Sequence, residues 1–128
     1  MSSASFRSTK SQLLYVGNEP SLSKASCILL KEAGFKVRST NPSHASDAVR
    51  DKHYVAVIFC ATLSGMEMDT IAELMESHQP GVPIISMQVG LLGEGAYRTS
   101  AAVVDALHGP QALIGAVRSV TLVDQKAS

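Results

Sequence analysis

The stretch Ala56-Val57-Ile58-Phe59-Cys60-Ala61-Thr62-Leu63-Ser64-Gly65-Met66 decides the fold of this chain. Residues 55–59 are apolar on both faces and rich in β-branched side chains, which is typical of a parallel strand covered by helices on both sides. The run ends at Cys60 and passes directly into a Ser-Gly turn. We therefore expect residues 55–59 to form the middle strand of a parallel sheet.

The rest of the chain alternates short apolar runs with amphipathic segments, which is the pattern of successive strand–helix–strand units. Further strands are predicted at residues 12–16, 35–40, 84–87 and 102–106. Helices are predicted at residues 22–33, 42–49 and 68–78 and from residue 110 onward, the first ending at Gly34. Three glycines within residues 90–95 indicate that any helix in residues 91–99 is short or irregular.

These elements predict an α/β fold, with a doubly wound five-stranded parallel sheet between two layers of helices. Right-handed crossovers predict the strand order 2-1-3-4-5. We expect one domain at residues 12–123, a flexible tail at residues 1–11 and a frayed end at residues 124–128.

Composition excludes several classes of function. The 128 residues include 11 basic and 11 acidic side chains, so the formal net charge is zero and gives no attraction to nucleic acid or to an anionic membrane. Cys27 and Cys60 lack metal-ligand spacing, and the four histidines are scattered, so no metal site is predicted. Free cysteines and the lack of a secretory signal favour a cytoplasmic location.

Any functional site should lie where the strands end, because the carboxyl ends of parallel strands meet at one edge of the sheet. The expected ends are Gly17–Glu19, Cys60–Thr62, Met87–Val89 and Ala106–Gly109. Cys60 itself has no basic neighbour in sequence, and free cysteines are among the most buried residue types, so it is interpreted as a packing residue.

Residues 12–122 resemble the response-regulator receiver domains, the CheY-like family with a flavodoxin-like fold. The resemblance rests on four segments: Tyr15-Val16-Gly17-Asn18-Glu19-Pro20-Ser21, Glu32-Ala33-Gly34-Phe35, Val57 to Met66, and Val82-Pro83-Ile84-Ile85. It implies a phosphorylation site at the carboxyl edge, with an acidic pair at Gly17 and Asn18, the phosphoacceptor aspartate at Cys60, a hydroxyl residue at Gln88 and a lysine near Ala106. This chain matches none of these positions, and Val103 stands about where the family carries a movable aromatic residue.

A degenerate receiver, or pseudo-receiver, is therefore expected. Magnesium prefers oxygen ligands that include carboxylates, and Asn18 with Glu19 alone makes a poor site. No cofactor, metal or enzymatic activity is predicted. The expected role is phosphorylation-independent protein–protein interaction in two-component-type signalling, as a single-domain response-regulator-like protein.

The expected partner is a protein: a kinase, a regulator or a second copy of the chain in a homodimer. No nucleic-acid or membrane partner is expected. The candidate docking surface is formed by Leu91, Leu92 and Tyr97, in the segment where the receiver-like pattern is shortened.

Three alternatives remain open. Cys60 could act as a thiol-based redox sensor at the former phosphoacceptor position. Ser64 or Thr62 could be phosphorylated instead. A nucleotide or anion could meet the first amides of the helix near Ser21, although no basic side chain close by is expected to complete that site.

Overall fold

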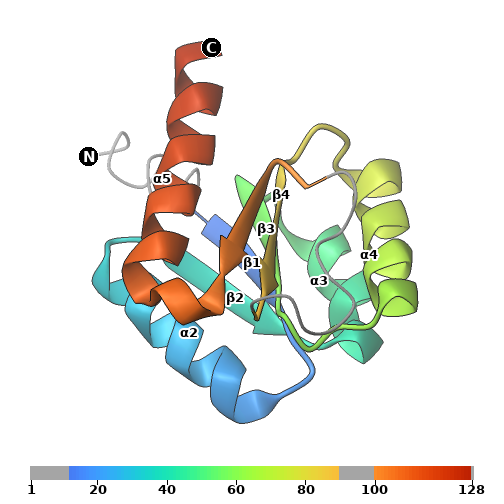
Figure 1. Ribbon diagram of the computed structural model, residues 1–128. Coiled ribbons are helices and arrows are strands. Elements are labelled where there is room, and N and C mark those ends of the chain that lie inside the picture. Colours follow the sequence, from blue (N-terminus) through green and yellow to red (C-terminus); the bar gives the residue numbers. More distant parts are fainter. Residues whose placement is uncertain (1–11, 90–99, 128) are drawn as a thin grey trace.

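Five parallel strands form the centre of the molecule, in the order β2-β1-β3-β4-β5 (Figure 1). The structure is a computed structural model, and it describes residues 12–89 and 100–127. The strands are β1 Gln12–Val16, β2 Lys36–Thr40, β3 Ala56–Phe59, β4 Ile84–Gln88 and β5 Ala102–Asp105. Each neighbouring pair is parallel, so the predicted fold class and strand order are confirmed.

Helices cover both faces of the sheet (Figure 1). Helices α2 and α5 lie on one face, and α3 and α4 lie on the other. Their bounds are α2 Pro20–Glu32, α3 Ala45–Asp51, α4 Gly65–His78 and α5 Pro110–Ala127, with short 3-10 helices η1 Pro42–His44 and η2 Ala106–His108. The expected short or irregular fourth helix falls on residues 90–99, outside the described residues. Helix α5 extends beyond residue 123, where the sequence suggested a domain boundary.

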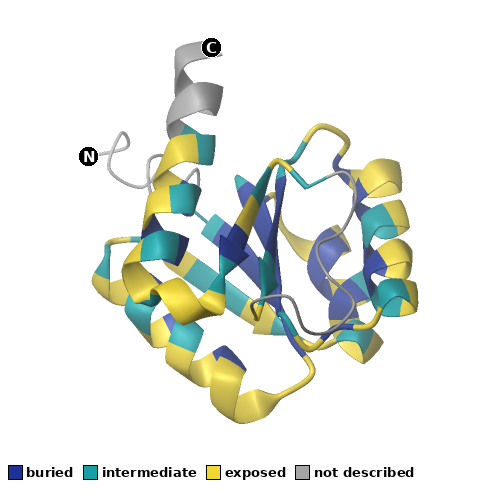
Figure 2. Cartoon of the chain, viewed as in Figure 1, coloured by how far each residue is buried: buried dark blue, intermediate teal, exposed yellow. Residues whose placement is uncertain are grey.

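The hydrophobic core lies on both faces of the inner strands (Figure 2). Strand β3 is buried along its whole length, as its apolar sequence predicted. Strand β2 contains only exposed and partly buried residues, because it is an edge strand with a polar sequence. In the described part of the chain, no helix is long and apolar enough to cross a membrane.

Helix α4 begins at Gly65, before the predicted start at Met68, because a capping box fixes its first turn. The Ser64 hydroxyl accepts a hydrogen bond from the Glu67 amide at 3.1 Å, and the Glu67 carboxylate accepts one from the Ser64 amide at 2.9 Å. The pattern Ser-x-x-Glu is a sequence signal for such a cap. It sets the direction in which the chain leaves Cys60.

Strand β5 ends at Asp105, whereas the sequence suggested an end at Ala106. The Asp105 carboxylate accepts a hydrogen bond from the Leu107 amide at 2.9 Å and so caps η2. Ala106 is therefore the first residue of a turn at the carboxyl edge of the sheet.

A buried amide joins the end of α4 to the loop before β3. Gln79 is 6% exposed, and its Oε1 accepts a hydrogen bond from the Tyr54 amide at 3.0 Å. Its Nε2 donates to the Val49 carbonyl at 2.7 Å and to the Lys52 carbonyl at 2.6 Å. One side chain therefore satisfies three backbone groups that come from a different part of the chain.

The Gln79→Leu variant should lose about 2–3 kcal/mol of unfolding free energy, because buried backbone groups would lose their partners without access to water. The matched control is Gln111→Leu, at an exposed position on α5, where we expect a change within about 0.5 kcal/mol. Urea denaturation of both variants measures the difference. An equal loss in the two variants would contradict this role for Gln79.

Candidate functional site at the carboxyl edge of the sheet

The backbone brings Gly17 and Cys60 side by side just past the ends of β1 and β3. The Cys60 amide donates to the Val16 carbonyl at 3.0 Å, and the Gly17 amide donates to the Thr40 carbonyl at 3.0 Å. These bonds continue the sheet pairing beyond the strands. Gly17 and Cys60, which the resemblance to receiver domains placed in one site, therefore do meet at one edge of the sheet.

Gly17 has no space for a side chain. A Cβ atom built on Gly17 would overlap the Ser23 hydroxyl, and it would lie 3.1 Å from Tyr15 Cε1 and 3.4 Å from Cys60 Cβ. Real Cβ atoms rarely approach other atoms so closely, so any larger residue would need Ser23 to move. The Ser23 hydroxyl, in the first turn of α2, therefore occupies the place that a Cβ atom at position 17 would take.

Asn18 is bound to the loop after β3. Its Nδ2 donates to the Thr62 carbonyl at 3.1 Å and to Glu67 Oε1 at 3.3 Å, and its Oδ1 accepts a hydrogen bond from the Thr62 hydroxyl. Both ends of this amide are therefore used within the protein. They hold the β1–α2 loop against the β3–α4 loop.

Cys60 is a buried thiol, 4% exposed. Its sulfur lies 3.3 Å from the Thr62 hydroxyl, which continues the chain of contacts from Asn18. Thr62 thus links the two positions, and sequence reasoning considered it only as a residue to be phosphorylated. Its spacing in the sequence carries no signal for this contact, because the partner Asn18 comes from another strand.

The other residues selected from the sequence occupy separate places. The Glu19 carboxylate accepts a hydrogen bond from the Ser21 amide at 3.1 Å and caps α2. Gln88 ends β4 opposite Asp105, and Ala106 lies at the start of η2. The predicted docking residues Leu91, Leu92 and Tyr97 lie outside the described residues.

An apolar cavity of about 290 Å³ adjoins this edge, between α2 and α5. Its wall includes Tyr15, Cys60, Met87, Ala106 and Leu113. The Tyr15 hydroxyl donates a hydrogen bond to the Ser26 hydroxyl at 3.3 Å, and burial raises the pKa of the Tyr15 phenol well above its ordinary value. The sequence did not indicate that Tyr15 lines a cavity, because an aromatic residue in a strand is typical of the hydrophobic core.

The side chains at this edge do not fit a magnesium ion. Gly17 contributes no ligand, Asn18 is hydrogen-bonded to the neighbouring loop through both Nδ2 and Oδ1, and the Glu19 carboxylate caps a helix. Magnesium requires near-octahedral oxygen ligands, generally with one or two carboxylates. Within residues 12–89 and 100–127, no group of three or more His, Cys, Asp or Glu is arranged to hold a metal.

No family model matches the chain, and no curated protein matches it. Solved structures do. A response regulator receiver domain protein (CheY-like) from Methanospirillum hungatei has a TM-score of 0.76 at 14% sequence identity, covering 93% of this chain and 99% of that chain. This chain has the receiver-domain fold.

Two further receiver-fold neighbours agree with this assignment. The receiver domain of a sensor histidine kinase from Pseudomonas aeruginosa, with magnesium coordinated in its active-site cleft, has a TM-score of 0.71 at 16% identity, covering 88% of this chain and 98% of that chain. A chain from the complex of the histidine kinase ThkA with the response regulator TrrA has a TM-score of 0.69 at 16% identity, covering 85% and 97%. The likeness extends over nearly the whole described fold.

The Gly17→Asp variant tests whether the acid position of this receiver fold is closed. We expect a loss of about 1–3 kcal/mol in unfolding free energy, because the new side chain must displace Ser23. Adding Ser23→Ala should recover part of that loss in a double-mutant cycle, measured by chemical denaturation.

The matched control is Gly115→Asp, since a Cβ at Gly115 meets nothing within 4 Å. That variant should be as stable as the wild type. A Gly17→Asp variant with wild-type stability would show that the position is open.

Proposed function

We propose that this chain is a pseudo-receiver: a receiver-fold module that acts in two-component-type signalling through protein contacts and not through phosphorylation of its own carboxyl edge. The main support for this proposal is the lack of space for a side chain at Gly17. A receiver-type site needs a carboxylate there, and the space is taken by Ser23 and Tyr15.

The chemistry of phosphoryl transfer supports the same conclusion. Catalysis of that reaction rests on positioning and on neutralising charge with metal ions and basic groups. Here the β3 edge offers the buried Cys60 thiol in place of a carboxylate, and Ala106 offers no cation. We therefore propose no enzymatic activity for the chain.

Protein contacts are the remaining means of signalling for such a module. The response regulator TrrA is found in complex with the histidine kinase ThkA, which makes a kinase, a regulator or a second copy of this chain the reasonable partners. Large apolar side chains are exposed at the same edge: Leu22 is 48%, Val89 39% and Leu107 71% exposed. These three residues, here named the apolar edge surface, are candidates for the contact.

Phosphorylation is tested by incubating the protein with magnesium and acetyl phosphate, followed by intact mass measurement. We expect no added phosphate. The Cys60→Asp variant should also stay unmodified, because a restored acceptor still lacks the carboxylate at position 17 and the lysine. Covalent phosphate on the wild-type chain, including Ser64 or Thr62, would refute phosphorylation independence.

Partner binding is tested by recovering proteins that associate with the tagged chain in its own cell. A kinase or regulator should be recovered with the wild type, and recovery should fall about tenfold for Leu22→Ser or Leu107→Ser. The control is Ile28→Ser, an equally exposed apolar residue on the opposite side of α2. The same measurement on Leu91→Ser and Leu92→Ser shows whether the partner binds instead to the docking surface predicted from the sequence. Recovery that no variant changes would exclude both surfaces.

The redox alternative at Cys60 has weaker support, because the thiol is almost fully buried. Cys27 is 7% exposed, and burial raises the pKa of its thiol. Alkylation or peroxide treatment followed by mass spectrometry compares the two cysteines. Equal and slow labelling would end the sensor hypothesis, whereas selective labelling of Cys60 would favour it.

A further inference from the structure

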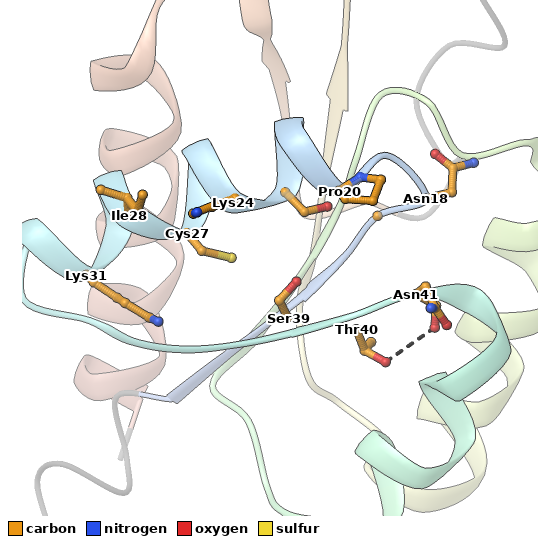
Figure 3. A pocket seen from close by; sticks show the side chains of 11 residues that line it. Asn18, Pro20, Lys24, Cys27, Ile28, Lys31, Ser39, Thr40 and Asn41 are labelled. Atoms are coloured by element: carbon orange, nitrogen blue, oxygen red, sulfur yellow. Dashed lines mark hydrogen bonds between the residues drawn. The ribbon is translucent and has the colours of Figure 1, made fainter.

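A second, larger cavity lies between α2 and the edge strand β2, and it reaches Gly17 and Asn18 at the carboxyl edge of the sheet (Figure 3). Its volume is about 550 Å³, within the range of small-molecule sites. Figure 3 shows Cys27 and Lys31 of α2 pointing toward β2, where Ser39 points back toward Cys27, and Lys24 one turn earlier on α2. The proposed signalling role makes no use of this cavity.

The wall of this cavity is positively charged, although the whole chain is neutral. Lys24 and Lys31 line it, and no aspartate or glutamate does. Among the described residues, Arg38 and Asp51 form an ion pair at 2.6 Å, whereas neither Lys24 nor Lys31 is paired with an acidic side chain. Such a local field attracts anions. Lys24 lines the same cavity as Pro20, so a basic side chain lies closer to the start of this helix than expected from the sequence.

The two lysines belong to one stripe of α2. Lys24, Cys27 and Lys31 are spaced by three and four residues, so they share one face of the helix. Seven residues of helix correspond to about 10 Å along the axis. The cavity therefore has a positive group near the start of α2 and another near its end, with an apolar section between them formed by Cys27 and Ile28.

An unpaired hydroxyl lies in the same wall. Ser23 is 6% exposed, and its Oγ is fully buried without a hydrogen-bond partner in the described structure. Buried polar groups are nearly always paired, and a change of the Ser23 χ1 rotamer would turn this hydroxyl toward the cavity, where a ligand can supply the partner. Ser23 lies in the first turn of α2, where the helix dipole also favours negative charge.

The opposite wall supplies further donors. Asn41 Oδ1 already accepts hydrogen bonds from the His44 amide at 2.9 Å and lies 3.0 Å from the His44 ring, so its Nδ2 is the group available to a ligand. The Ser39 hydroxyl lines the cavity beside it, and so does Thr40, whose hydroxyl already donates to the Asn41 carbonyl at 3.3 Å. A rim of donors around an apolar section fits a molecule with a phosphate at one end and a carbon skeleton.

We propose that the cavity between α2 and β2 binds a phosphorylated small molecule, with its phosphate at Lys24 and the first turn of α2. Lys31 and the apolar section formed by Cys27 and Ile28 contact the rest of the ligand. A lysine ammonium and hydroxyl donors are suited to a phosphate monoester. Nucleotides and sugar phosphates share this chemistry. The proposal stands independently of the signalling role, since it needs neither phosphorylation nor a protein partner.

Titration of the ¹⁵N-labelled chain, followed by NMR, tests the site. The probes are adenosine monophosphate, glucose 6-phosphate and inorganic phosphate, with adenosine as the unphosphorylated control. Either ester should shift the amides of residues 23–31 and 39–41, and adenosine should not. Binding of the nucleotide alone identifies a nucleotide site, and binding of both esters identifies a general phosphate site. No shift from either ester up to about 10 mM, or equal shifts from adenosine, would overturn the proposal.

Charge variants locate the phosphate. Lys24→Gln should weaken binding about tenfold, as expected for a lost charged hydrogen bond. The matched control is Lys52→Gln, which removes an exposed lysine after α3, on the other face of the sheet. Equal weakening in both variants would mean nonspecific attraction and would overturn the site.

Ser23→Ala separates a ligand contact from a packing role. Removing a buried hydroxyl that has no partner should leave the melting temperature unchanged or higher, yet it should weaken ester binding. Unchanged ester affinity in this variant would remove Ser23 from the site. Unchanged ester affinity in both Ser23→Ala and Lys24→Gln would overturn the proposal.

Discussion

The close approach of α2 to the end of β1 depends on the missing side chain of Gly17. The first turn of the helix places the Ser23 hydroxyl where a Cβ atom at position 17 would lie, and the Tyr15 ring and Cys60 complete the enclosure. Because protein interiors are closely packed, any side chain at position 17 would require Ser23 to move. Glycine at position 17 therefore allows α2 to pack directly against the end of β1.

Helix α2 separates two cavities of different character. One side carries Leu22, Ser26 and Leu29 toward the apolar cavity next to α5, and the other carries Lys24, Cys27 and Lys31 toward β2. Both stripes follow helical spacing, so a single helix can present an apolar surface and a positively charged one. The two cavities therefore lie on the two flanks of α2, next to the carboxyl ends of the strands.

Most elements of the fold could be predicted, because their signals are local. The apolar run at β3 and the polar run at β2 indicated a central and an edge strand, and Gly34 adopts the positive φ expected after α2. The start of α4 was predicted too late, although the signal Ser64-x-x-Glu67 was present. The role of Gln79 could not be predicted, because its three backbone partners lie 25 to 30 residues away in sequence.

The sequence by itself determined the alternation of strands and helices, the strand order and the absence of acids at positions 17 and 60. These properties depend on side-chain type and on spacing within one segment. Only the tertiary structure decided that Ser23 closes the space at Gly17, that Asn18 and Thr62 join two loops, and that Lys24 and Lys31 share a cavity with β2. The physical reason is that these contacts join elements far apart in the chain, so their geometry follows from packing around the sheet and not from any local pattern.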